Sequence, residues 1–190
     1  MAEKCARVFE RAGFSKRHVA KKIENGDTAW HDKCETIACA LNDGALLVLV
    51  GKRGTGKTQM VVEASKRFLK SREVGSEAPE IRYTKAIEVF VELRGSYRDD
   101  SSLSEQVIIK NYCRPQVLII DEMHERGESS WEDRILTHII DTRYGAMKDT
   151  ILISNQKIDE FKEQLGPSIM SRLTETGGMI DCDWDSFRQA

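Results

Sequence analysis

One octapeptide restricts the fold of this chain more than any other feature. It follows directly after the apolar run Leu46–Val50 and reads Gly51-Lys52-Arg53-Gly54-Thr55-Gly56-Lys57-Thr58. Every fixed position of the pattern GxxxxGK[ST] is matched, and a helical pattern follows, which is the context that this phosphate-binding loop (P-loop) requires. The sequence therefore predicts a buried strand, a glycine-rich loop and a helix, in that order.

Each part of this octapeptide has a separate task toward a nucleotide. Glycines allow the backbone N–H groups to turn toward phosphate oxygens, and the N-terminus of the following helix adds partial positive charge. Lys57 is expected to reach the β- and γ-phosphates, and the Thr58 hydroxyl is expected to bind Mg²⁺. We therefore expect the whole loop from Gly51 to Thr58 to bind ATP or ADP together with Mg²⁺.

Two further apolar runs also end in polar residues. Val117–Ile120 leads into Asp121 and Glu122, and Ile151–Ile153 leads into Ser154 and Asn155. We expect Asp121 to hold the Mg²⁺ shell and Glu122 to orient and polarise the attacking water. Asn155 either bonds that water or the γ-phosphate, or is an ordinary turn residue.

Apolar runs alternate with helical patterns along the rest of the chain. Weaker strand candidates are Glu80–Thr84 and Gly178–Cys182. The helical segments are Thr28–Leu41, Lys57–Ser71, Ala86–Tyr97, Leu103–Tyr112, Glu132–Tyr144 and Ile158–Leu165. Strands separated by helices predict a parallel, doubly wound α/β sheet. Ligands of such sheets bind beyond the carboxyl ends of the strands, which places all three polar strand ends at one crevice.

Composition limits the class of protein. The 190 residues suit one domain, and 40% hydrophobic with 32% charged residues is ordinary for a soluble protein. No apolar run approaches the roughly 20 residues of a membrane span. The net charge of −2 gives no overall basic surface for nucleic acid, although residues 1–25 hold seven Lys or Arg against three Glu. Five cysteines without a CxxC pair favour a reducing, cytoplasmic location.

Several segments carry a resemblance to a known family. They are Phe9–Phe14, Ile139–Tyr144, Thr150–Asn155, Leu165–Leu173 and the Trp-Asp-Ser-aromatic-Arg ending Trp184–Arg188. Together with the P-loop they resemble the AAA+ ATPases, and within them the DnaC/DnaI-type replicative helicase loaders and their relative IstB. The resemblance implies a P-loop NTPase fold of the AAA+ type, with a five-stranded parallel sheet sandwiched by helices and no C-terminal lid. We interpret residues 1–26 as a basic N-terminal arm and residues 27–190 as the ATPase domain.

The same resemblance implies how the site is completed. Arg172 matches the arginine finger that enters the ATP site of a neighbouring subunit, so ATP-bound chains are expected to self-associate into an oligomer. The alternative for Arg172 is an ion pair with a surface carboxylate such as Glu175. Arg143 is a second, weaker candidate for an interface arginine.

Loaders and initiators of this group also carry an extra helix that grips single-stranded DNA. The matching segment is Asp99–Tyr112. Its candidate phosphate ligands are Arg94, Arg98, Lys110 and Arg114, and its candidate stacking residues are Tyr97 and Tyr112. The alternative is a charged helix face with no ligand.

The predicted function is that of an ATP-hydrolysing DNA replication protein. By resemblance its partners are single-stranded DNA and the replicative helicase, with no membrane. An IstB-like helper ATPase of transposition is the nearest alternative. A small-molecule P-loop kinase would need an arginine-rich lid, which the sequence lacks, and Glu122 argues against a DNA-binding module that uses ATP only as a structural ligand.

Overall fold

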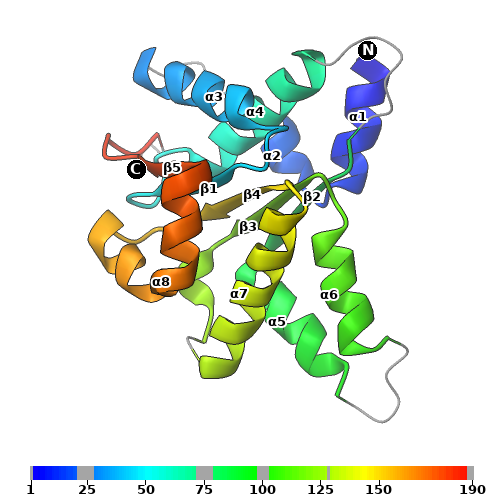
Figure 1. Ribbon diagram of the computed structural model, residues 1–190. Helices are drawn as coiled ribbons and strands as arrows, with labels where there is room; N and C mark the ends of the chain where they lie inside the picture. Colours follow the sequence, from blue (N-terminus) through cyan, green and yellow to red (C-terminus); the bar gives the residue numbers. More distant parts are fainter. Residues whose placement is uncertain (1, 21–27, 72–78, 98–102, 128, 188–190) are drawn as a thin grey trace.

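The computed structural model describes residues 2–20, 28–71, 79–97, 103–127 and 129–187. Its five strands are β1 (Leu46–Val50), β2 (Ile81–Lys85), β3 (Val117–Asp121), β4 (Asp149–Ile153) and β5 (Gly178–Asp181). They form one parallel sheet in the order β2-β3-β4-β1-β5 (Figure 1). The predicted five-stranded parallel sheet is therefore confirmed.

Helices cover both faces of this sheet (Figure 1). One layer holds α1 (Ala2–Arg11), α2 (Lys16–Ala20), α3 (Thr28–Ala40) and α4 (Lys57–Ser71), and the other holds α5 (Ala86–Gly95), α6 (Glu105–Cys113), α7 (Ser130–Gly145) and α8 (Ile158–Thr176). A short 3₁₀ turn, η1 (Met123–Glu125), follows β3. Among the described residues after β5, 182–187, there is no further helix.

Two hydrophobic clusters fill the space between the sheet and its helices. Side chains alternate along each strand, so Leu47 and Leu49 of β1 pack toward α3 and α4, whereas Leu46, Val48 and Val50 pack toward α5–α8. All five residues of β1, β3 and β4 are buried, as expected for central strands of a parallel sheet. This burial on both faces fixes the strands whose carboxyl ends carry the candidate site.

The described part of the N-terminal arm packs on the ATPase domain. Phe9, Ala12 and Phe14 are buried in the same cluster as α3 and α4, and Phe14 stacks on Tyr83 of β2 with ring centroids 4.7 Å apart. The predicted boundary between residues 26 and 27 lies outside the described residues, so the division into arm and domain stays a prediction.

The last helix is longer than its sequence pattern predicted. The pattern ended at Leu165, but α8 continues to Thr176 across a kink at Gly166, whose φ is 70°. Pro167 follows the kink, and its fixed φ with no N–H donor suits the first position of a new helical segment. The second segment carries Arg172.

Candidate functional site

The P-loop connects β1 to α4 with the geometry that phosphate binding needs. Gly54 and Gly56 have φ values of 91° and 81°, a left-handed conformation that glycine adopts without a steric cost. Lys57 is 5% exposed, and its Nζ donates to the carbonyl oxygens of Gly51 at 2.6 Å and Lys52 at 2.7 Å. The ammonium group is therefore held within the curve of the loop.

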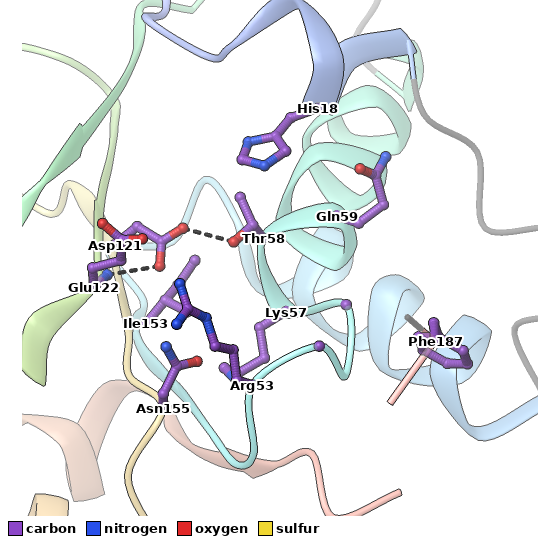
Figure 2. A pocket seen from close by; sticks show the side chains of 12 residues that line it. His18, Arg53, Lys57, Thr58, Gln59, Asp121, Glu122, Ile153, Asn155 and Phe187 are labelled. Carbon is purple, nitrogen blue, oxygen red and sulfur yellow. Dashed lines mark hydrogen bonds between the residues drawn. The ribbon is translucent and has the colours of Figure 1, made fainter. Parts of the chain in front are cut away.

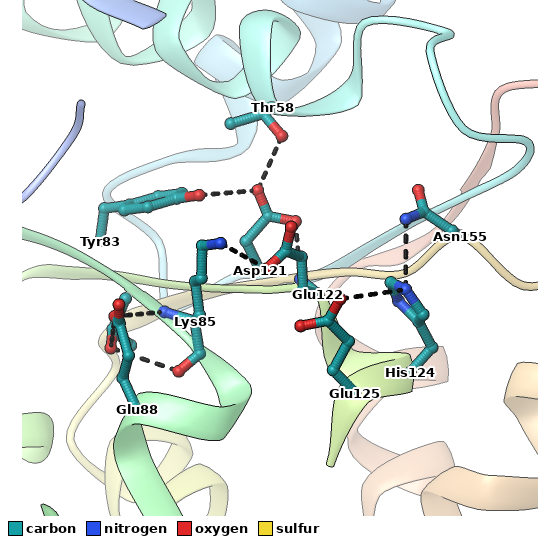
Figure 3. Close-up of polar contacts among 10 residues, drawn as sticks. Thr58, Tyr83, Lys85, Glu88, Asp121, Glu122, His124, Glu125 and Asn155 are labelled. Atoms are coloured by element: carbon teal, nitrogen blue, oxygen red, sulfur yellow. Dashed lines mark hydrogen bonds and ion pairs between the residues drawn. The ribbon is translucent and has the colours of Figure 1, made fainter. Parts of the chain in front are cut away.

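Thr58 and Asp121 join the P-loop to the end of β3. The Thr58 hydroxyl donates to Asp121 Oδ2 at 2.7 Å, and the Tyr83 hydroxyl donates to the same oxygen at 2.9 Å (Figure 3). The other oxygen, Oδ1, accepts the Glu122 backbone N–H at 2.7 Å. A hydroxyl and a carboxylate at this spacing are hard oxygen ligands of the kind that Mg²⁺ prefers, so these residues fit the metal.

Glu122 follows β3 in a left-handed conformation, with φ 56° and ψ 41°. Its Oε2 forms an ion pair with Lys85 Nζ at 2.8 Å, and this bond raises the pKa of Lys85 (Figure 3). Lys85 is the last residue of β2 and is in register with Asp121 of β3. The carboxylate proposed to activate water is thus paired with a cation from the neighbouring strand.

Asn155 follows β4 and contacts η1. Its Nδ2 lies 3.3 Å from His124 Nε2, and Figure 3 shows its amide oxygen pointing away from the imidazole. The Ser154 hydroxyl donates to Gln156 Oε1 at 2.8 Å, which helps to form the turn. The side chain of Asn155 is therefore held at the crevice by a residue of the β3–α7 connection.

Most of the predicted site residues line one pocket (Figure 2). The predicted site residues that line it are Arg53, Gly54, Gly56, Lys57, Thr58, Asp121, Glu122 and Asn155. Gly51, Lys52 and Thr55 belong to the same loop but do not line the pocket. His18, Gln59 and Phe187 line it as well, from α2, α4 and the segment after β5. The three predicted strand ends do converge.

Arg172 does not line this pocket. Its Nε lies 3.0 Å from Asp141 Oδ1, its Nη1 donates to the Ser168 carbonyl at 2.8 Å, and its guanidinium carbon lies 5.3 Å from the Tyr144 ring centroid. In this chain Arg172 therefore forms an ion pair of the kind given as the alternative to the finger, with Asp141 of α7 instead of Glu175. Only a quarter of the side chain is exposed, at 24%.

Arg143 is not an interface arginine, and that prediction is wrong. The side chain is fully buried and donates to the carbonyl oxygens of Tyr112, Pro115, Gln116 and Asp149. Burial lowers the pKa of Arg143 to about 10. Its role is to donate hydrogen bonds to backbone carbonyl groups just before β3 and at the start of β4, which would otherwise be buried without a donor.

The candidate DNA-binding residues divide by their surroundings. Tyr112 is 1% exposed and donates to Glu92, so the prediction that it stacks on bases is wrong. Arg94 pairs with Glu132 at 2.5 Å and Arg114 with Glu80 at 2.7 Å. Lys110 is exposed, as is Tyr97, whereas Arg98 lies outside the described residues together with the start of the predicted helix.

The sequence matches one protein family over most of its length. The family of the IstB-like ATP binding protein covers residues 33–190, which includes every predicted site residue. The chain belongs to this IstB-like ATP-binding family. Membership in this family supports nucleotide binding.

Curated relatives of this IstB-like protein include two from Escherichia coli K12. The uncharacterized protein YdaV is 28% identical over 190 residues, which span 96% of this chain and 73% of YdaV. The replicative helicase loader DnaC is 25% identical over 199 residues, which span 98% of this chain and 77% of DnaC.

Solved structures establish the AAA+ type of the fold. The DnaC helicase loader aligns with a TM-score of 0.69 at 17% identity, over 88% of this IstB-like chain and 99% of that structure. A replication initiator DnaA bound to AMPPCP and single-stranded DNA aligns with a TM-score of 0.65 at 18% identity, over 86% of this chain and 48% of DnaA. No helix within the described ranges is long and apolar enough to cross a membrane.

Besides His18 and Gln59 of the pocket lining, three polar residues that contact predicted site residues of this IstB-like protein were not predicted. Tyr83 and Lys85 lie on β2, whose predicted range stopped at Thr84, so nothing placed Lys85 at the strand end. His124 follows the acidic pair, and no local pattern indicates its contact with Asn155, 31 residues away. A stronger β2 signal would have identified the first two.

Proposed function

We propose that this protein hydrolyses ATP at the crevice between β1, β3 and β4. One observation carries the proposal: the Thr58 hydroxyl lies 2.7 Å from Asp121 Oδ2, so the P-loop and the acidic end of β3 form one Mg·ATP site. Burial of Lys57 and Asp121, at 5% and 4% exposed, supports it, since buried charges are kept where a site needs them.

Each side chain has a distinct task in this proposal. Lys57 and the loop N–H groups bind the β- and γ-phosphates, while Thr58 and Asp121 hold Mg²⁺, which when bound neutralises charge on the phosphate oxygens. Glu122 accepts a proton from the attacking water. Asn155 orients that water through its amide oxygen, which Figure 3 shows turned away from His124. Lys85 must release the Glu122 carboxylate before this carboxylate can accept the proton.

We propose that Arg172 completes the site of a neighbouring subunit. Its absence from the lining of this chain's own pocket supports an action in trans, and its present bonds to Asp141 and Ser168 involve exposed or half-buried groups. Such bonds contribute little to stability and exchange readily. A guanidinium offers planar, permanently charged contact to phosphate oxygens, which suits it to this task.

The assembled protein is proposed to act in DNA replication. The similarity to the helicase loader DnaC supports a replicative helicase as partner, and the DnaA likeness supports single-stranded DNA as ligand. Lys110 and Tyr97 are exposed, and Arg94 and Arg114 are exposed although ion-paired, so these four are the candidates for DNA contact among the described residues. ATP binding would favour the DNA-gripping assembly and hydrolysis would release it.

The test is ATP turnover with and without single-stranded DNA, over a range of protein concentrations, for the native chain and Arg172→Ala. Turnover per chain is expected to rise with concentration, and the variant is expected to lose about 10³-fold while still binding ATP. Lys162→Ala, an exposed position on the first segment of α8, is the matched control. Concentration-independent turnover with a normal Arg172→Ala variant would leave the ATPase but reject the finger.

A helper ATPase of transposition is the second candidate function. The family match to the IstB-like ATP binding protein favours it specifically. The two candidates differ in the partner, so the ATP-bound protein should be presented to purified hexameric helicase and, separately, to a transposase–DNA complex. Retention of helicase alone supports the loader, and retention of the transposase complex alone supports the helper.

A further inference from the structure

The segment after β5 runs along the P-loop, and its residue Phe187 also lines the pocket. The Cys182 backbone N–H donates to the Val50 carbonyl at 2.9 Å, and a Cβ added to Gly51 would lie 2.4 Å from the Cys182 carbonyl oxygen. Further along, the Trp184 indole N–H donates to the Thr55 carbonyl at 3.0 Å. The Phe187 backbone N–H donates to the Gly54 carbonyl at 3.0 Å. We name residues 182–187 the strap.

These bonds fix the direction of two peptide groups. In a trans peptide the C=O of one residue and the N–H of the next point in opposite directions, and the described residues contain no cis peptide bond. Holding the Gly54 and Thr55 carbonyls toward the strap therefore turns the N–H groups of Thr55 and Gly56 the other way. Gly54 and Gly56 both line the pocket, so we take this direction to be the pocket side of the loop.

The Trp184 side chain is itself held in place. Lys33 Nζ lies over its ring, 4.8 Å from the centroid, and also donates to the Asp181 carbonyl. Lys33 is on α3, so the indole is clamped between this helix and the loop. A cation over an indole face is an attractive contact, which restrains the ring without covering its N–H.

From this geometry we infer that Trp184 is a positioning residue for nucleotide binding. Its indole N–H, with the Phe187 N–H, aims the P-loop amides at the phosphates before a nucleotide arrives. Preorganised donors bind an anion more tightly because no reorganisation accompanies binding. The inference rests on the proposed nucleotide site and adds a second element, the strap, that sets its affinity.

The test compares Trp184→Phe with Trp131→Phe. Both remove one indole N–H and keep a ring, but the Trp131 N–H donates to the Tyr97 hydroxyl at 3.3 Å on the opposite face of the sheet. ADP affinity is measured by displacement of a fluorescent ADP analogue, with the melting temperature of the nucleotide-free protein as a second readout. Trp184→Phe is expected to bind ADP about three- to tenfold more weakly, the effect of one lost hydrogen bond. Its melting temperature should match that of Trp131→Phe.

Tryptophan emission gives an independent signature. ADP should change the emission of the native chain and of Trp131→Phe, and this change should be absent in Trp184→Phe. Equal ADP affinity in all three proteins would reject the positioning role of Trp184 and leave the nucleotide site intact. Weaker ADP binding together with a lower melting temperature in Trp184→Phe alone would have the same meaning. Failure of every chain to bind ADP would instead reject the proposed function.

Discussion

The two sides of the crevice are built differently. On the binding side, Lys57, Thr58 and Asp121 bond to one another or to the P-loop, and the two charged groups are buried. The hydrolytic side consists of Glu122 and of Arg172, which does not line this chain's own pocket and is proposed to enter that of a neighbouring subunit. Glu122 is bonded to Lys85 and Arg172 to Asp141, and neither partner has a part in the proposed reaction. The side chains of Glu122 and Arg172 are 25% and 24% exposed.

This difference separates nucleotide binding from hydrolysis. The groups of the binding side already lie together, and Lys57 only has to exchange its bonds to the Gly51 and Lys52 carbonyls for phosphate oxygens. The hydrolytic side must exchange partners, and this is possible because the outer partners, Lys85 and Asp141, are 42% and 37% exposed. Ion pairs open to solvent are weak, at about 0–1 kcal/mol. A chain built this way is expected to bind ATP readily as a monomer and to hydrolyse it only once Glu122 and Arg172 have changed partners.

Among substitutions that act within one chain, Glu122→Gln should separate ATP hydrolysis from ATP binding the most. Glutamine keeps the shape but cannot accept the proton of water, so turnover is expected to fall by about 10²-fold or more with ATP affinity unchanged. Phosphate release and displacement of a fluorescent analogue measure the two quantities. Glu163→Gln, at an exposed carboxylate of α8 that does not line the pocket, is the control and should behave as the native chain. Turnover near the native rate in Glu122→Gln would remove the base from the hydrolytic side.

Lys85→Met tests whether the ion pair restrains the hydrolytic side. Methionine keeps the length of the side chain but releases Glu122, so turnover is expected to rise about two- to fivefold, the equivalent of one weak ion pair. Lys85→Arg, which keeps the charge, should leave turnover at the native value. A fall in turnover for Lys85→Met would mean that Lys85 assists the reaction instead of holding its base.

The sequence was informative about the binding side for a physical reason. Its residues follow strong apolar runs directly, and parallel strands bring their carboxyl ends to one edge, so spacing along the chain translated into proximity. The parallel α/β sheet was predictable on the same grounds, whereas its count of five strands came from two weaker runs and the family resemblance. Glu122 and Asn155 were located this way too, but their partners were not.

Partners were missed where contacts depend on tertiary packing. Lys85 ends a strand with a weak pattern, and His124 meets Asn155 through the packing of η1 beside β4. Arg143 looked like a surface cation because its neighbours in sequence give no sign that five carbonyl oxygens converge on it. Tyr112 shares a helix face with Ile108, and this apolar face indicates burial. The charged residues nearby in the sequence nevertheless favoured a DNA contact.

Tyr83→Phe should give the smallest effect. It tests how strongly the position of the Asp121 carboxylate depends on the Tyr83 hydroxyl. The Tyr83 hydroxyl donates to Asp121 Oδ2, and burial raises the pKa of Tyr83, so the hydroxyl stays a neutral donor throughout the usual pH range. Phenylalanine removes this donor but keeps the ring that stacks on Phe14. Because Thr58 still donates to the same oxygen, we expect the Mg²⁺ concentration for half-maximal ATP binding to rise only about twofold, with turnover at saturation unchanged. A titration of Mg²⁺ at fixed ATP measures it. A rise of about tenfold or more would show that Asp121 is held by Tyr83 rather than by the P-loop, and the binding side would then depend on β2 as the hydrolytic side does.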